Sequence, residues 1–169
     1  MKNTLLIILG IVLFSGTAFS QSYETDKESQ EAMSKLAFIE GNWKGEGWMM
    51  RQDGKKHPFT QTEKISFKLD GTALLVEGLG KEGEKIIHNA LAVITYDKTK
   101  GHYNFNSRLA NGMGGNFKAE LIDNELHWYP NENIKYIISL NEKGQWHEVG
   151  KIKRGEEWFQ FFEMTLDKQ

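Results

Sequence analysis

Apolar and polar residues alternate along most of the chain, in runs of seven to thirteen residues. Such alternation is typical of β-strands, because successive side chains of a strand point to opposite faces of the sheet. Short groups of turn-forming residues separate these runs and predict hairpin turns. The groups lie at Asp53-Gly54, Asp70-Gly71, Glu82-Gly83, Asp97 to Gly101, Asn111-Gly112, Asp123-Asn124, Pro130 to Asn133, Asn141 to Gly144 and Arg154-Gly155. Nine turns predict ten consecutive antiparallel strands.

One segment, TDKESQEAMSKLAFIEG, has helical spacing instead of alternation. Its start carries a capping-box pattern, with Thr25 three residues before Glu28. Gly41 can end the helix, because glycine accepts a positive φ without steric cost. The apolar residues with helical spacing are Met33, Leu36 and Ala37. The pattern therefore predicts one short helix ahead of the first strand.

Ten consecutive antiparallel strands leave two unpaired edges unless the sheet closes on itself. A sandwich of two five-stranded sheets is the alternative arrangement. Connections of hairpin length, without a long crossover, favour the closed form. We therefore predict an all-β fold, a ten-stranded antiparallel up-and-down β-barrel with a short N-terminal helix. Because ten strands enclose more space than side chains easily fill, a cavity is expected.

The first twenty residues have the features of an export signal. Lys2 is followed by the ten-residue apolar run LLIILGIVLF and by the small-residue segment TAFSQ. Ten helical residues span about 15 Å, which is half of a bilayer core of about 30 Å. We therefore expect residues 1–20 to be a signal peptide cleaved before Gln21. Residues 21–169 are expected to form a single domain, with no membrane span, in the periplasm or outside the cell.

Charge and cysteine content narrow the classes of partner. Removing Lys2 with the leader leaves 21 − 1 = 20 basic residues against 23 acidic residues, a net charge of about −3. This balance argues against nucleic acid or an anionic membrane surface as a partner. The chain has no cysteine, so disulfides and thiolate metal sites are excluded. Without disulfides, the fold must be stabilised by its core, which is rich in aromatic residues. We expect the protein to be a monomer or a homodimer.

The segment GNWKGEGW, Gly41 to Trp48, resembles the first-strand signature of the calycins, the lipocalin-like barrels. It resembles the ten-stranded nitrobindin-like and related bacterial lipocalin-like domains more than true lipocalins, and EEWFQFFEMTLDK resembles the last strand of that bacterial group. The resemblance implies a lipocalin-like, ligand-holding β-barrel in which Gly41 and Trp43 form the floor. Gly45 and Gly47 share the face of Trp43, where they either leave room for a ligand or relieve crowding.

Nitrobindin-like barrels bind haem, and the resemblance implies an iron-ligating histidine near the start of the last strand. Residues 156–169 contain no histidine, and Met164 is the one soft ligand available there. We therefore expect no cofactor and no metal site. Haem bound by a histidine elsewhere is the alternative, and each such histidine can equally be a half-exposed strand residue. The candidates are His88, His102, His127 and His147.

Several polar residues lie within otherwise apolar strands, among them Glu148 in WHEVG. If they face inward, they need partners, and Arg108 paired with Glu63 or Glu77 is the expected ion pair. The alternative is that they face solvent. Aromatic residues would surround the apolar part of a ligand held by this polar cluster. The predicted ligand-binding residues are Glu63, Glu77, His88, Arg108, Trp128, Tyr136, Trp158 and Phe162.

Catalytic motifs are absent: the chain has no G-x-S-x-G elbow, no H-E-x-x-H, no phosphate loop and no thiol nucleophile. We therefore predict a non-enzymatic, exported barrel that binds a small hydrophobic or amphipathic molecule. Two alternatives stay open. One is an enzyme acting on a small apolar substrate, and the other is an interaction module that uses the outer face of the barrel.

Overall fold

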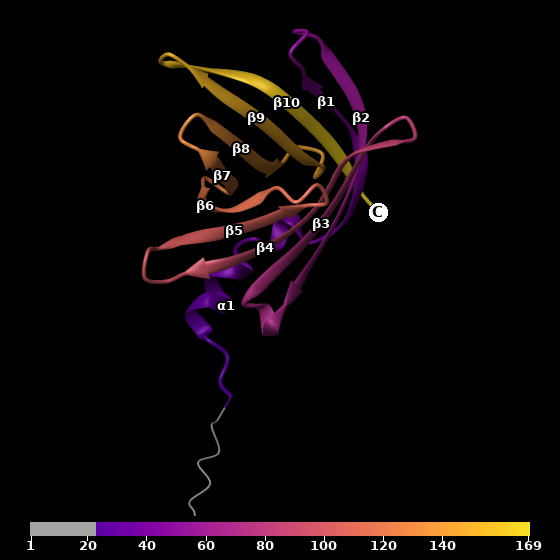
Figure 1. Cartoon of the computed structure of the whole chain (residues 1–169). Helices are drawn as coiled ribbons and strands as arrows, with labels where there is room; N and C mark the ends of the chain where they lie inside the picture. Colours follow the sequence, from indigo (N-terminus) through magenta and orange to yellow (C-terminus); the bar gives the residue numbers. More distant parts are fainter. Residues whose placement is uncertain (1–22) are drawn as a thin grey trace, which may run out of the picture.

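The computed structural model describes residues 23–169, which form one closed β-barrel with a short helix at one end (Figure 1). The expected signal peptide, residues 1–20, lies outside the described residues. The helical elements are α1 (Lys27–Ser34) and the 3-10 turns η1 (Ala37–Ile39) and η2 (Leu69–Gly71). The strands are β1 (Gly41–Met50), β2 (Lys56–Lys68), β3 (Ala73–Glu82), β4 (Lys85–Asp97), β5 (His102–Leu109), β6 (Gly114–Ile122), β7 (Glu125–Asn131), β8 (Ile134–Leu140), β9 (Trp146–Arg154) and β10 (Glu157–Lys168).

Each strand pairs antiparallel with its neighbours in sequence, and β1 pairs with β10 to close the barrel. The closing ladder runs from Trp43 opposite Lys168 to Met49 opposite Phe162. All nine turns fall where the Gly-, Asn- and Asp-rich groups predict them. The prediction of a ten-stranded up-and-down barrel is therefore confirmed.

The helix begins one residue later than the capping-box pattern predicts. Asp26 is the N-cap, and its side chain accepts a hydrogen bond from the backbone N–H of Ser29 at 3.3 Å. The Thr25 hydroxyl instead donates to Asp70 at 3.4 Å, across to η2. The capping box from Thr25 to Glu28 is therefore wrong, because the Asp26 carboxylate is the N-cap acceptor that Thr25 was expected to be.

The helical segment covers one end of the barrel, beneath β3 and β4 in Figure 1. Its regular part ends at Ser34, short of the predicted end, and η1 carries the chain on to β1. Met33 and Leu36 are buried as expected, whereas Ala37 is exposed. The buried Tyr103 hydroxyl donates to the Ala32 carbonyl at 2.8 Å, which fixes α1 to β5. Among the described residues, no helix is long and apolar enough to cross a membrane.

Trp43 lies at the floor of the barrel, just above this helical cover. It is 2% exposed, and its indole N–H donates to the Ile39 carbonyl at 2.9 Å. Its ring meets that of Trp146 edge to face, with centroids 6.0 Å apart. Gly41, with φ of 138°, turns the chain from η1 into β1. An added Cβ there would lie 2.7 Å from Cε of Lys168.

Gly45 and Gly47 lie against β10 and not against the interior space. A Cβ on Gly45 would lie 2.8 Å from Cα of Leu166. A Cβ on Gly47 would lie 2.6 Å from Cζ of Phe59 and 2.7 Å from Cβ of Met164. Of the two readings of these glycines, relief of crowding agrees with the structure.

Candidate functional site

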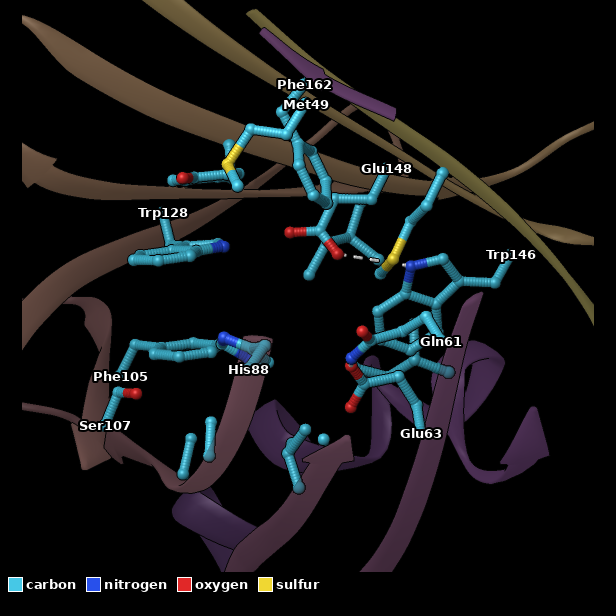
Figure 2. A pocket seen from close by; sticks show the side chains of 18 of the residues that line it. Met49, Gln61, Glu63, His88, Phe105, Ser107, Trp128, Trp146, Glu148 and Phe162 are labelled. Atoms are coloured by element: carbon cyan, nitrogen blue, oxygen red, sulfur yellow. Dashed lines mark hydrogen bonds between the residues drawn. The ribbon is translucent and has the colours of Figure 1, made fainter. Parts of the chain in front are cut away.

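The barrel encloses a cavity of about 210 Å³ above the Trp43 floor. Its mouth is at the end opposite α1, because Met49, Phe59 and His88 lie near the strand ends that meet there. Figure 2 shows the side chains that line it. The volume is below the range of about 300–1,000 Å³ that holds drug-sized ligands, so the space suits a small molecule.

Alternation along β2 brings a polar pair into this space. Phe59, Gln61, Glu63 and Ile65 are all buried, while the residues between them are exposed. The Gln61 amide donates to Oε1 of Glu63 at 2.6 Å. Both side chains point into the cavity in Figure 2. The strand therefore places an amide and a carboxyl side by side in an apolar interior.

Two glycines of the neighbouring strand β3 make room for this pair. Gly78 lies opposite Glu63, and Gly80 lies opposite Gln61. A Cβ on Gly78 would lie 2.8 and 2.9 Å from the two carboxyl oxygens of Glu63, and a Cβ on Gly80 would overlap the Gln61 amide oxygen. Glycine is needed at both positions because the polar side chains lean over the β3 backbone.

A second buried carboxyl comes from β9, which is separated from β2 in the barrel by β1 and β10. Trp146, Glu148 and Gly150 alternate inward along this strand, and Glu148 is 7% exposed. The indole N–H of Trp146 donates to Oε2 of Glu148 at 3.3 Å, the dashed line in Figure 2. Glu63 and Glu148 therefore face the same space from two different strands.

The apolar surroundings shift both carboxyls toward the protonated form. Burial raises the pKa of Glu63 from 4.5 to about 7, against an opposing hydrogen bond from Gln61. Burial, and secondarily the nearby Glu63 carboxyl, raises the pKa of Glu148 from 4.5 to about 8. Of the residues that line the cavity in the described part of the chain, none is lysine or arginine. The two carboxyls therefore have no lysine or arginine beside them in the described lining.

Three stacked rings form one wall of the cavity. The Trp128 ring lies parallel to Phe105, with centroids 4.7 Å apart, and to Tyr136, with centroids 4.5 Å apart. Gly150 makes room for Tyr136, since a Cβ there would lie 2.8 Å from its ring. Because the stack restrains Trp128 between two rings, it offers its edge to the cavity.

The edge that Trp128 presents carries its polar atom. Figure 2 shows the indole nitrogen pointing across the cavity toward Glu148. Within the described part of the chain this buried N–H has no hydrogen-bond partner, although it lies near enough to lower the pKa of Glu148 somewhat. Buried donors are normally satisfied, so this one indicates a place where a polar group or a water belongs.

His88 lies at the mouth of the cavity, beside Phe105 (Figure 2). The β3–β4 ladder shifts register between Gly80 and Lys81, and Ile87 is the extra residue. This β-bulge lets two consecutive residues, Ile87 and His88, line the cavity. His88 keeps part of its surface in solvent, and burial of the rest lowers the pKa of its imidazole.

The structure brings together five of the eight predicted ligand-binding residues and separates three. The five that line the cavity are Glu63, His88, Trp128, Tyr136 and Phe162. The three that do not line it are Glu77, Arg108 and Trp158.

The expected ion pair of Arg108 with Glu63 or Glu77 is wrong. Ser107 lines the cavity, so Arg108, the next residue of β5, points outward. Its guanidinium donates to the backbone carbonyls of Ser107 at 2.7 Å and Gly115 at 3.1 Å. Glu77 is also on the outer face, where its carboxylate lies 3.8 Å from Nζ of Lys64.

Trp158 is placed on the outside for a similar reason. It lies near the start of β10, and its exposed fraction is 37%. Nζ of Lys135 lies 4.5 Å from the centroid of its ring. Only Phe162 and Met164 of β10 line the cavity, so the aromatic start of that strand contributes nothing to it.

The residues present do not fit haem held by a histidine of the last strand, because β10 offers Phe162 and Met164 to the cavity. Of the other candidates, His127 lies 3.2 Å from Glu125 and His147 lies 3.4 Å from Glu163, and neither lines the cavity. His102 is also outside the lining. His88 is thus the one candidate histidine that faces the cavity within residues 23–169. The described residues contain no group of three or more His, Asp or Glu side chains placed to hold a metal ion.

The lining residues that were not predicted as site residues include Gln61, Phe105, Trp146 and Glu148. In the strands of Gln61 and Glu148, the alternation of inward and outward positions could have indicated that these side chains face the cavity. Gln61 lies between Phe59 and Glu63 on one face of β2, and Glu148 lies two residues after Trp146. Glu148 was noticed as a polar residue in a strand, but its face was left open.

The closed ten-stranded barrel with one capped end and an interior cavity defines a calycin-like barrel. Two of the solved structures that share this fold differ widely from this chain in sequence. One is Rv2717c from M. tuberculosis, with a TM-score of 0.61 and 9% identity over 82% of this chain and 97% of that one. The other is the S-type phycobiliprotein lyase CPES from Guillardia theta, with a TM-score of 0.55 and 9% identity over 87% and 98%. No protein-family model matches the chain. The search of curated proteins also returned no match.

Proposed function

We propose that the mature protein binds one small, mainly apolar molecule with a polar group inside the barrel, and that it does so without catalysing a reaction. The observation that supports this most strongly is the pairing of an aromatic wall with buried polar groups that lack a full set of partners. Glu63 and Glu148 face the same space, and the Trp128 N–H has no hydrogen-bond partner among the described residues. Ligand sites commonly combine apolar walls with a few such polar groups.

The protonation behaviour of the cavity supports binding over acid–base catalysis. A general acid and a general base need environments that push their pKa values apart. Here burial raises the pKa of Glu63 and Glu148 and lowers that of His88. All three shifts favour the neutral form, which suits a site that holds a ligand.

The first-strand motif GNWKGEGW supports a place near the nitrobindin-like domains within the calycin-like barrels, with a different ligand. The structure of similar fold from Guillardia theta is a phycobiliprotein lyase. We take from it only that the barrel fold is compatible with more than one function.

The leader supports export as the setting of this function. Lys2, the short apolar run and TAFSQ are the three parts of a cleavable signal. We propose that the barrel works in the periplasm or outside the cell. Its ligand would then be a molecule met in that compartment.

A blocking variant tests the proposed function. Ala92 lines the cavity and is 4% exposed, whereas Ala110 is exposed in the turn between β5 and β6 and does not line the cavity. Small aromatic probes with different polar groups, together with a fatty acid and hemin, would be titrated while tryptophan fluorescence is followed. We expect saturable one-to-one binding of at least one small probe, weakened at least about tenfold by Ala92→Leu and unchanged by Ala110→Leu. Circular dichroism would verify that both variants keep their fold.

Two results would contradict this proposal. One is the absence of saturable binding by every probe. The other is a tight one-to-one hemin complex with the spectrum of a histidine-ligated iron, lost on His88→Ala, which would make the protein a haem binder with a ligand on β4.

A further inference from the structure

We propose that the polar group of the ligand is a basic nitrogen, and that the barrel selects small aromatic or alkyl amines through Glu63 and Glu148. This inference rests on the proposed binding function and names the chemical class of the ligand. The two carboxyls face the same cavity from β2 and β9, which are separated in the barrel by β1 and β10. Glu63 lies near enough to raise the pKa of Glu148, so an ammonium group placed against this part of the wall can donate to both carboxyls.

The charges around the cavity favour a cation and disfavour an anion. The lining contains two glutamates and, within the described residues, no lysine or arginine. A carboxylate or phosphate ligand would have to enter beside two acidic groups without a counter-charge, which is costly in an apolar interior. An ammonium ion, in contrast, supplies the charge and the donors that a carboxylate requires.

The hydrogen-bond donors already in the site act on the same carboxyl. The indole N–H of Trp146 donates to Glu148 at 3.3 Å, and that of Trp128 points toward Glu148 without a bonded partner. Both donors favour the ionised form of Glu148. When an amine supplies the counter-charge, Trp128 and Trp146 can therefore help to hold the carboxylate that binds it.

The rest of the cavity fits a short apolar body. Phe59 and Phe162 stack with centroids 5.6 Å apart, and both line the cavity. Together with the Phe105, Trp128 and Tyr136 wall, they enclose a volume of about 210 Å³. Ring faces near an ammonium group also attract it through cation–π contacts. A single ring on a short linker is thus the body that the space favours.

Three probes with the same ring and two-carbon linker separate the possibilities. Phenethylamine carries an ammonium group, phenethyl alcohol a neutral hydroxyl and hydrocinnamate a carboxylate. We expect phenethylamine to bind at least about tenfold more tightly than either of the others at pH 8, as measured by isothermal titration calorimetry. Hydrocinnamate is expected to bind weakest.

Isosteric variants assign the effect to the two carboxyls. Glu63→Gln and Glu148→Gln keep the side-chain shape, and each is expected to weaken phenethylamine binding by about tenfold to a hundredfold, the range for a hydrogen bond to a charged group. Phenethyl alcohol binding should change by less than about threefold, within the spread of neutral hydrogen bonds. Glu77→Gln, on the outer face, is the matched control and should change neither.

The binding should also depend on pH. The titratable groups facing the site are Glu63 on β2, His88 on β4, Tyr136 on β8 and Glu148 on β9. Burial lowers the pKa of His88 and raises that of Tyr136. Both side chains therefore favour the neutral form in the window of roughly pH 6.5 to 8.5 in which the two carboxyls titrate. Because the carboxyls ionise in this window, phenethylamine affinity should rise with pH while phenethyl alcohol affinity stays flat.

The outcomes distinguish the two proposals. If phenethyl alcohol or hydrocinnamate binds as tightly as phenethylamine, the amine proposal is overturned and the binding function stands. If amine affinity is unchanged by both glutamine variants, the assignment to Glu63 and Glu148 is overturned. If none of the three probes nor any probe of the wider set binds, both proposals fail.

Discussion

Glu63 and Glu148 are acidic residues in an interior that is otherwise apolar and aromatic. Carboxyls in such places are usually paired with a basic side chain, and the described lining offers these two neither lysine nor arginine. They stay neutral instead, at a free-energy cost once the pH is high enough to ionise them. Retaining them in the core is unfavourable for stability alone, which is why we connect them with ligand binding.

Stability should therefore fall as the pH rises through the titration of these two carboxyls. Their folded-state pKa values of about 7 and about 8 lie above the unfolded value of 4.5, so the folded protein binds more protons between these limits. The favourable contribution is complete below about pH 4.5 and is lost by about pH 8. The free energy of unfolding should decrease by on the order of a few kcal/mol over that window.

Urea unfolding at pH 5, 6.5 and 8, roughly spanning that window, checks this expectation. Glu63→Gln and Glu148→Gln should each flatten the slope and be more stable than the parent protein at the highest pH. Glu77→Gln should keep the parent slope, because its carboxylate lies on the outer face. A flat profile in the parent protein would mean that the two carboxyls are not buried as described.

Trp43 is the residue on which the floor of the barrel depends. Trp43→Ala should lower the free energy of unfolding by about 3–5 kcal/mol, the range for deleting a large buried aromatic side chain. Lys44, the next residue, is exposed, and Lys44→Ala should cost less than about 0.5 kcal/mol. Chemical denaturation measures both, with Trp43→Phe as a milder variant if the alanine protein does not fold. Similar losses from Trp43→Ala and Lys44→Ala would contradict the placement of Trp43 on the inner face of β1 and of Lys44 on its outer face.

At the scale of the elements, α1 is fixed at both its start and its buried face. Asp26 caps its first turn and also contacts Lys98 at 2.6 Å, on the turn between β4 and β5. Asp26→Ala should therefore lower Tm more than Thr25→Ala does, because Thr25 is not the N-cap. Asp26→Asn, which keeps a cap acceptor, should recover part of the loss. Thermal unfolding followed by circular dichroism makes the comparison, and a larger loss with Thr25→Ala would restore the capping-box prediction.

The elements themselves could be predicted from the sequence, because each turn carries its own signal. Groups such as Asp53-Gly54 and Asn111-Gly112 mark chain reversals by local chemistry that does not depend on the rest of the fold. The uninterrupted series of hairpins then leaves little choice besides closure. The strand order and the Trp43 floor follow from these two observations.

The face of each strand was harder to predict, and the site depends on it. β2 alternates cleanly, so the inward position of Glu63 was accessible from the sequence. β4 does not alternate cleanly, because the bulge at Ile87 turns two consecutive residues inward. Arg108 was assigned to the interior on its chemistry alone, whereas the inward place in that stretch of β5 belongs to Ser107. Beyond a bulge, the face on which a side chain lies depends on how the strand pairs with its neighbour. The sequence of one strand does not contain that information.

For the whole molecule, the capped end and the open end have different roles. The helical cover and Trp43 close one end, and the cavity opens at the other, where Met49, Phe59 and His88 lie. A ligand therefore enters away from α1. Rv2717c and the phycobiliprotein lyase share this barrel at 9% identity, so the interior chemistry of each has to be read from its own residues.

Export is a prediction that concerns the whole chain. Protein recovered from the periplasm or the medium of its own host should begin at Gln21, because the small residues of TAFSQ are a cleavage signal. Intact-mass analysis with N-terminal peptide mapping measures this. An intact leader on the exported protein, or protein found solely in the cytoplasm, would contradict the prediction.

The central claim is that the ligand lies inside the barrel, between the carboxyls and the stacked rings. The five tryptophans allow a direct measurement, because each indole N–H gives its own nuclear magnetic resonance signal, assignable by single Trp→Phe variants. On titration with phenethylamine, the signals of Trp128 and Trp146, which line the cavity, should move together and saturate at one equivalent. Those of Trp48 and Trp158, which do not line it, should stay in place. Movement confined to Trp48 or Trp158, or no saturable movement at all, would contradict the account.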